Sequence, residues 1–481
     1  MNVVQRIAKN AAALYMAKVT NVLLNLLYMM HIARYLGAEG FGILSFGLAF
    51  TGLFGVFTDM GLFLLTVREI ARARHLASKY FLNLSIIKII LGGMTLGLIG
   101  LVINILGYPK ITVMVVYILA LSVALSAVNK MFYSIFQAFE KMEYQLFGQV
   151  LSSFLIYSGV KLGINHGFGI IAFASLYPLA NIILILYNVV VLKCRFQDSI
   201  LSRVSWKEIE YNFWKKTIKE ALPFGLALIF VTIFYWIDSV MLSLMKGDEV
   251  VGWYNAAYRM VLAPLFIPRS LVDAIYPVMS KFYISSKDSL RLSFEKSFKY
   301  LTMLGIPFGV GTTLLAKKLI LIIFGEGYIN SVVPLQILVW SSVFIFMSVT
   351  FGNLFNSLNK QIIVTKITGI CVGLNVALNL VLIPKYSLIG ASIATVLTEF
   401  ISLVLSIIWS FKIGYSVPTK GFFDIARILF SGSVMGIFVM LFQASLSLLL
   451  LVPSAVLVYS AALYIVRGID REDMLVLQKI R

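Results

Sequence analysis

The chain has 481 residues, of which 60% are hydrophobic and only 13% are charged. A typical soluble domain has close to twice this charged fraction, and a fold surrounded by water could not bury so many apolar side chains. The net charge of +19 comes from Lys and Arg residues that lie in short segments between apolar runs. This pattern is typical of membrane proteins, and we expect no nucleic-acid partner.

Apolar runs long enough to cross a bilayer recur along the whole chain. A helix needs about 20 such residues to cross the hydrocarbon. The run from Ile428 to Val466 has no charged residue and is too long for one span, so it predicts two, with Pro453 near the turn. We expect fourteen spans, at residues 11–33, 41–66, 81–106, 111–138, 144–163, 168–192, 220–245, 254–282, 299–324, 329–357, 363–383, 387–411, 423–445 and 448–466.

The distribution of positive charge predicts the orientation in the membrane. Of the 40 Lys and Arg residues, 27 fall in the segments that share a side with the N-terminus, and seven fall in the alternate segments. Basic residues are retained on the cytoplasmic side. We therefore expect a multi-pass protein of the cell membrane with both termini in the cytoplasm.

An internal repeat indicates two similar lobes. The pattern Gly-x-Glu-x-x-Gly begins at Gly37 and again at Gly247, and the related segments 136–141 and 355–360 follow at a similar offset. Such glycines allow a tight turn between helices, and the acid can lie at a helix N-terminus. An offset of six helices predicts a parallel repeat. The predicted parts are a six-helix lobe at 1–192, a linker at 193–219, a second six-helix lobe at 220–412, and two further helices with a cytoplasmic tail at 413–481.

The linker is the longest polar stretch between two predicted spans. It carries seven Lys and Arg residues together with Trp206 and Trp214. Basic and aromatic residues together are typical of a segment that lies on lipid headgroups. We expect the linker to lie on the inner membrane surface.

The sequence carries no pattern typical of a cofactor or metal site. Cys194 and Cys371 are far apart and offer neither a disulfide framework nor a zinc spacing. No phosphate-binding glycine loop and no His-Glu-x-x-His motif occur. Basic residues precede the first apolar run as in a signal peptide, but Lys18 interrupts that run, so we expect a retained first helix.

Several motifs follow one another in a recognisable order. They are Ala-Arg-Tyr-Leu-Gly-Ala-Glu-Gly-Phe-Gly at 33–42, Asp-Met-Gly-Leu at 59–62 with Val-Arg-Glu-Ile-Ala-Arg at 67–72, Phe-Gly-Glu-Gly-Tyr at 324–328, and Leu-Ile-Gly-Ala-Ser-Ile-Ala-Thr at 388–395. This set resembles the polysaccharide repeat-unit (O-antigen, Wzx-type) flippases, which belong to the multidrug/oligosaccharidyl-lipid/polysaccharide exporter superfamily.

The resemblance implies an all-α membrane protein with two six-helix lobes in a V around a central cavity. It implies a transporter without enzymatic activity that flips a polyprenyl-pyrophosphate-linked oligosaccharide from the cytoplasmic to the outer leaflet by alternating access. Membrane lipids and polysaccharide-assembly proteins would be its partners. Gly-x-x-x-Gly pairs are explained by helix packing within one chain, so we expect a monomer.

Two other functions remain open. A cation-coupled multidrug and toxin extruder of the same superfamily would need acids in its cavity, whereas a pyrophosphate needs Lys and Arg. Six basic residues assigned to the helices favour the flippase: Lys18, Lys88, Lys130, Arg259, Arg269 and Lys281. A membrane glycosyltransferase or polymerase would normally have a large loop outside the membrane, and all the predicted outer loops are short.

Ionisable residues inside spans are costly and mark functional sites. Lys18 shares one helix face with Asn21 and Asn25. The resemblance implies that cations of the first and eighth helices face the cavity, which selects Lys18 and Arg259 as the first candidates for the pyrophosphate. The full set of candidate substrate-binding residues is Lys18, Asn21, Asn25, Lys88, Lys130, Arg259 and Arg269.

Acids within the spans are the candidates for a coupling ion. Asp59 and Asp238 are the residues selected for this role, and Asp273 and Glu399 are two further candidate acids within spans. For every charge within a span, a salt bridge or an extension to the interface is the alternative explanation.

Overall fold

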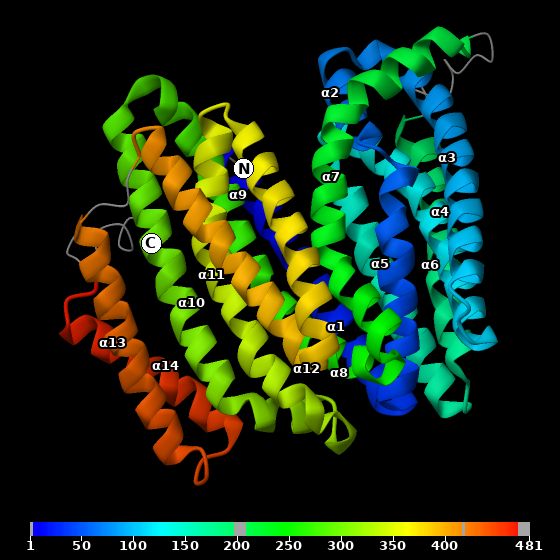
Figure 1. Ribbon diagram of the computed structural model, residues 1–481. Helices are drawn as coiled ribbons and strands as arrows, with labels where there is room; N and C mark the ends of the chain where they lie inside the picture. Colours follow the sequence, from blue (N-terminus) through cyan, green and yellow to red (C-terminus); the bar gives the residue numbers. More distant parts are fainter. Residues whose placement is uncertain (1–2, 197–207, 416–418, 470–481) are drawn as a thin grey trace. The chain divides into compact units, whose positions relative to one another are not determined.

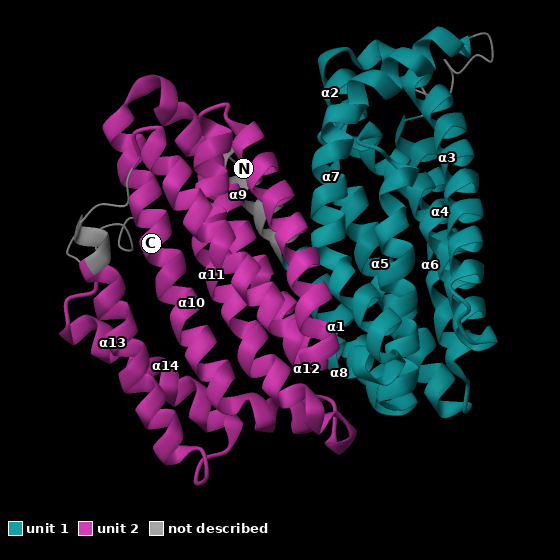
Figure 2. Cartoon of the chain, viewed as in Figure 1, with its two compact units in different colours: residues 1–255 teal, residues 256–481 magenta. Residues whose placement is uncertain are grey.

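The computed structural model describes residues 3–196, 208–415 and 419–469 (Figure 1). All the regular structure in these ranges is helical, as the sequence predicts. The chain divides into two compact units, residues 1–255 and 256–481 (Figure 2). This division lies after α7, whereas the predicted lobes are separated by the linker at 193–219. The compact units are defined by contacts between residues, whereas the predicted lobes are defined by an internal repeat of the sequence. The two divisions need not coincide, and the lobes remain a prediction.

Unit 1 is a bundle in which α1 packs against α4, α5 and α7, and α4 packs against α3 and α6. The final helix of this unit, α8, begins in unit 1 and ends in unit 2. The elements are α1 (Val3–Phe54), η1 (Gly55–Thr58), α2 (Leu62–Arg72), η2 (Arg74–Leu76), α3 (Ala77–Ile105), α4 (Lys110–Ala138), α5 (Met142–Asn165), α6 (Ile170–Phe196), α7 (Tyr211–Lys246) and α8 (Asp248–Leu262).

Unit 2 is built on α10, which packs against α9, α11 and α13, while α11 also packs against α12. Gly305 and Gly309 of α10 approach Phe346 and Val343 of α11, so this predicted Gly-x-x-x-Gly pair packs helices within the chain. The elements are η5 (Ala263–Leu265), α9 (Phe266–Ser285), α10 (Lys287–Ile323), η6 (Glu326–Ser331), α11 (Val332–Ser357), α12 (Gln361–Lys412), α13 (Thr419–Phe442) and α14 (Leu448–Ile465).

Two helices are too long for a single span. Twelve helices among the described residues are long and apolar enough to cross a membrane. α1 and α12 each have 52 residues, about 78 Å at 1.5 Å per residue, against a hydrocarbon thickness of about 30 Å. The backbone of α1 breaks at Gly37 (φ 70°), and that of α12 breaks at Ser387 (φ 53°). If each helix supplies two spans, the total is consistent with the predicted fourteen.

The predicted span at 41–66 is wrong at its second end. The helix stops at Phe54, and the chain turns through Asp59, Met60 (φ 45°) and Gly61 (φ 85°) before α2 begins. The Asp59 carboxylate accepts a hydrogen bond from the Phe63 N–H at 3.3 Å and so satisfies one backbone donor in the first turn of α2. This turn separates the short helix α2 from the end of α1, whereas the hydrophobic pattern predicted one continuous span across both.

Two other boundaries differ from the predictions. The predicted helix at 254–282 is divided by η5, because Pro264 and Pro268 lack the N–H that a continuous helix needs. The helix predicted to begin at residue 220 begins at Tyr211, so the last part of the predicted linker is helical. The linker residues 197–207 lie outside the described residues.

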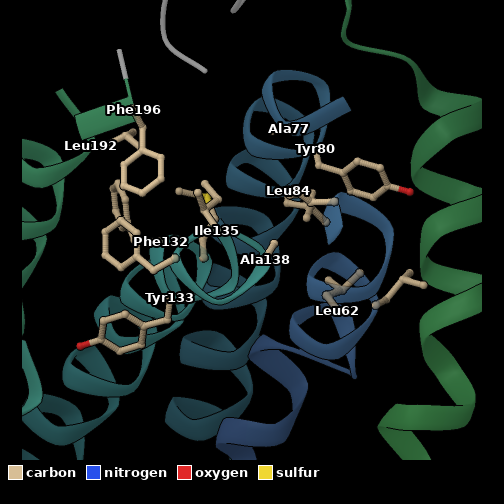
Figure 3. Packing of buried hydrophobic residues seen from close by; sticks show 14 of the residues in the cluster. Leu62, Ala77, Tyr80, Leu84, Phe132, Tyr133, Ile135, Ala138, Leu192 and Phe196 are labelled. Atoms are coloured by element: carbon tan, nitrogen blue, oxygen red, sulfur yellow. The ribbon is translucent and has the colours of Figure 1, made fainter. Parts of the chain in front are cut away.

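A core of aromatic and aliphatic side chains joins α2, α3, α4 and α6 at one end of unit 1 (Figure 3). The rings of Phe136 and Phe196 stack with their centroids 5.6 Å apart, and Tyr80 meets Phe213 of α7 edge to face at 4.9 Å. Leu62 of α2 is fully buried in this core. We call this end of unit 1, which also carries Arg72 and Arg74, the basic end; the opposite end, with Gly37 and Gly247, is the glycine end.

Candidate functional site

A buried ion pair joins two predicted site residues in unit 1. The Lys88 ammonium on α3 lies 2.5 Å from the Asp59 carboxylate, and their side chains are 1% and 7% exposed. A pair of opposite charges that also share a hydrogen bond satisfies both groups away from water. The structure therefore accounts for Lys88 and Asp59 without a substrate or a coupling ion.

Lys130 lies beside this pair on α4. Its side chain is exposed, and its charge acts on both Asp59 and Lys88. Among the described residues, no acid lies within ion-pair distance of the Lys130 ammonium. Lys130 therefore stays a candidate for an anionic ligand.

The polar stripe predicted on the first span is present in α1. Asn25 donates to Asn21 Oδ1 at 3.2 Å and to Ser153 of α5 at 3.2 Å, and Tyr28 donates to Asn25 at 2.5 Å. Ser153 also donates to Asn21. The two asparagines thus connect α1 to α5, while Lys18, one turn away, is half-buried.

Asp238 lies on α7 and is buried. Its carboxylate accepts a hydrogen bond of 2.8 Å from the Tyr254 hydroxyl of α8. The neighbouring Ser239 and Asn255 are hydrogen-bonded to each other at 3.0 Å. This polar layer holds α7 against the first turns of α8.

The two glycine motifs contact each other at the glycine end. A Cβ placed on Gly42 would lie 1.7 Å from the carbonyl oxygen of Asp248, and one placed on Gly252 would lie 1.9 Å from the carbonyl oxygen of Ala38. The contact is reciprocal, since Asp248 follows Ala38 at the same offset of 210 that relates Gly252 to Gly42. Such exchange is expected of a twofold relation between repeats.

An asparagine fixes the start of α7 at the basic end. Asn83 of α3 is fully buried, donates to the Glu208 carbonyl at 2.9 Å, and accepts from the Glu210 N–H at 3.3 Å and the Trp214 indole at 2.7 Å. Lys79 adds an ion pair to Glu210 at 3.0 Å. No sequence pattern indicated this contact.

The cations predicted in the eighth span lie in unit 2. Arg259 is half-buried on α8, and Arg269 is exposed on α9. Within the part of the chain that the structure describes, neither guanidinium has an ion-pair partner. Lys18 belongs to unit 1 and Arg259 to unit 2, so their joint role at the pyrophosphate remains a prediction.

An apolar cavity of about 670 Å³ lies in unit 2. It is lined by α8, α10, α13 and α14, including Met260, Phe308, Met435 and Tyr459, and none of the lining residues is charged. The Tyr459 hydroxyl donates to the Met303 carbonyl at 2.8 Å, which leaves an almost wholly apolar lining. The cavity can hold a hydrocarbon chain.

Polar contacts hold α13 against α10 beside this cavity. Lys299 of α10 pairs with Asp424 of α13 at 3.7 Å, and Lys318 donates to the carbonyl of Gln443, just after α13. The contacts lie near the two ends of α13. They keep one wall of the cavity in place.

A polar seam between the two halves of α12 was only partly predicted. The first half contributes the buried residues Cys371, Asn375 and Asn379, and the second half contributes Thr395 and Glu399. Asn379 donates to Asn375 at 3.1 Å, and the Asn375 Nδ2 atom has no hydrogen-bond partner in the described ranges. The helical spacing of Asn375 and Asn379 was a signal that could have found them, but only Glu399 was named.

A family model described as "Polysaccharide biosynthesis protein" matches residues 7–283, more than half of the chain. The chain belongs to the polysaccharide biosynthesis protein family. A second family model, MatE, matches residues 223–381. The resemblance stated from the sequence motifs is confirmed.

This member of the polysaccharide biosynthesis protein family has similar proteins in several organisms. It is 22% identical to the capsular polysaccharide biosynthesis protein CapF of Staphylococcus aureus over 412 residues, 82% of this chain and 97% of that protein. It is 25% identical to a putative O-antigen transporter of Shigella flexneri over 383 residues, which cover 76% and 88% of the two chains. A probable low-salt glycan biosynthesis flippase of Haloferax volcanii is 25% identical over 35% of this chain and 36% of its own length.

Solved structures share the fold of this family member. The lipid II flippase MurJ in an inward closed conformation has a TM-score of 0.76 and 16% identity, over 95% of this chain and 99% of that one. A multidrug resistance MATE family transporter has a TM-score of 0.69 and 16% identity, over 85% and 95%. These likenesses confirm the all-α membrane fold that was predicted.

Proposed function

We propose that the chain is a flippase that moves a polyprenyl-pyrophosphate-linked oligosaccharide from the cytoplasmic to the outer leaflet by alternating access. Family membership and relatives named as O-antigen transporters and glycan flippases support this proposal. One observation carries it: Arg259, without an ion-pair partner in the described residues, directly precedes Met260, which lines the apolar cavity. A lipid pyrophosphate carries its anionic group directly next to a hydrocarbon chain, just as the cationic Arg259 lies directly next to the apolar cavity.

The head of the substrate is assigned to cations and its tail to apolar surface. Lys18 and Arg259 contact the pyrophosphate, and Lys130 and Arg269 provide further positive charge along the path. Charge-assisted hydrogen bonds to phosphate are strong where water is excluded. The first isoprene units occupy the cavity beside Met260, and the rest of the tail stays in the bilayer. The oligosaccharide then never enters hydrocarbon, where each unpaired polar group would cost several kcal/mol.

The remaining predicted residues receive structural roles. Lys88 and Asp59 hold the turn before α2, while Asn21 and Asn25 connect α1 to α5. The chain acts as a monomer in the cell membrane with both termini cytoplasmic and performs no chemical step on its substrate. Lipids and polysaccharide-assembly proteins are its partners.

The proposal is tested with purified protein in vesicles that contain an undecaprenyl-pyrophosphate-linked oligosaccharide. A lectin added outside reports the glycan that reaches the outer leaflet. The native protein should expose the glycan, and Lys18→Ala or Arg259→Ala should slow exposure about ten- to a hundredfold, since one charge-assisted hydrogen bond contributes about 1.5–3 kcal/mol. Lys18→Arg should keep most of the activity because it keeps the charge.

Arg291→Ala is the matched control, because Arg291 pairs with Glu295 on an exposed face of α10. Normal flipping by Lys18→Ala would make Lys18 structural. If the native protein moves no glycan but expels a cationic dye from the same vesicles, the chain is a multidrug extruder, the function to which the MatE match points.

A further inference from the structure

Glu399 lies in the middle of a span. It is twelve residues after the break at Ser387 and thirteen before the last residue of α12, Lys412. At 1.5 Å per residue, the carboxyl-bearing residue is about 18 Å from one end of this half-helix and about 20 Å from the other. That position is the centre of the hydrocarbon, where an acid is costly and marks a functional site.

Within the described part of the chain, no countercharge lies beside Glu399. The side chain is 8% exposed, and α11, the helix packed against α12, contains no ionisable residue. The first half of α12 brings Cys371 close, with its Sγ atom 3.8 Å from the Thr398 carbonyl. Lys366 and Lys385, on the same half, are exposed. Among the described residues, no hydrogen bond or ion pair reaches the carboxyl group.

Glu399 also belongs to a continuous polar line along one face of its helix. The hydroxyl-bearing residues are Ser392, Thr395, Ser402, Ser406 and Ser410, and together with Glu399 they recur every three or four residues. Positions three and four apart lie on one helix face. Several of these hydroxyls donate to a backbone carbonyl in the preceding turn, so each still has an oxygen that can accept a hydrogen bond. The line runs almost the full length of the half-helix.

We propose that Glu399 is a proton-binding site, and that the proton it carries couples transport to the proton gradient. An ionised carboxylate at this depth has no partner, so the resting form is the neutral acid. In one state of the cycle the acid releases its proton to the aqueous phase on one side, through the polar line. In the other state the carboxylate takes up a proton from the opposite side and again becomes the acid. The coupling rests on the proposed flippase function, whereas the proton site does not.

The proton site is tested first without transport. Infrared difference spectra of the purified native protein should show a carboxylic-acid C=O band that shifts in deuterated water. Glu399→Gln should remove this band, while Glu326→Gln, which alters an exposed acid of unit 2, should leave it in place. Persistence of the whole band in Glu399→Gln would overturn the assignment.

The coupling is tested in the glycan-flipping vesicles. With one proton per cycle, each pH unit across the membrane should change the ratio of glycan in the two leaflets about tenfold. Glu399→Gln should abolish this response to pH, and Glu326→Gln should retain it. A native ratio that ignores the pH gradient, or that follows a sodium gradient instead, would refute proton coupling. No flipping by the native protein under any gradient would refute the flippase, while the infrared result would still decide the proton site.

Discussion

At the scale of single residues, Gly42 and Gly252 show that a repeated glycine motif can serve two purposes. Its glycines allow a tight turn between helices, and they also allow the backbone of another segment to approach closely. The sequence predicts turns at Gly37 and Gly247, and both residues have positive φ, at 70° and 89°. It does not predict that the last glycine of each motif packs against the backbone of the other motif. The spacing of residues within one motif does not indicate which distant segment will pack against its glycines.

Replacing Gly42 by alanine should prevent closure of the glycine end. The new Cβ would overlap the Asp248 carbonyl oxygen, and overpacking of this kind costs about 1–3 kcal/mol even where the backbone can adjust. In a background without native cysteines, oxidative cross-linking of Ala38→Cys to Asp248→Cys should fall several-fold. Gly93→Ala is the control, because its Cβ would meet no atom within 4 Å. Unchanged cross-linking in Gly42→Ala would show that the contact does not form in the membrane.

The charged residues show a similar limit. Composition and depth select Lys88 and Asp59 as costly residues, but their pairing depends on the turn at Met60 and Gly61, which places the carboxylate against α3. Lys130 and Arg259 have the same intramembrane character in the sequence, yet neither has an ion-pair partner among the described residues. A candidate list can therefore be written from the sequence, whereas the division into structural and available charges needs the fold.

At the scale of elements, spans are easier to predict than the segments that join them. The apolar runs locate α3, α4, α5 and α6 within a few residues, because a hydrocarbon solvent forces every backbone group into a helix. The segment from Glu208 to Trp214 is polar and was predicted as linker. Its position depends on the buried amide of Asn83, and a single polar residue inside an apolar helix does not identify its partner.

Asn83→Leu should release the start of α7 from α3. The substitution removes the hydrogen bonds to Glu208, Glu210 and Trp214, each with a net contribution of about 1 kcal/mol. Trypsin should then cut faster at Lys215 and Lys216, which are exposed near the start of α7. Asn104→Leu, an exposed asparagine at the other end of α3, is the matched control. Equal cleavage of the two variants would show that Asn83 does not hold this segment.

At the scale of the whole molecule, the number of spans depends on the breaks in α1 and α12. Both were predicted, because 52-residue apolar helices exceed the bilayer and each contains turn residues near its middle. The division into compact units was not predicted, since α7 packs against α1 and α2 although the predicted repeat assigns it to the second lobe. An internal repeat can be predicted from the sequence, whereas the boundary between compact units depends on which side chains contact one another in the fold.

Reporter fusions that measure the membrane topology can distinguish fourteen spans from twelve. If α1 and α12 each cross twice, a reporter fused after residue 73 should be cytoplasmic like the N-terminus, one after residue 107 should be outside, and one after residue 290 should be cytoplasmic. If each crossed once, all three readings would reverse, although the C-terminus would be cytoplasmic in both cases. Fourteen spans are expected because Arg68, Arg72 and Arg74 then stay on the cytoplasmic side, as basic residues near span ends do. A reporter after residue 73 that reads outside would therefore refute both the break at Gly37 as a turn and the proposed orientation of the first two spans.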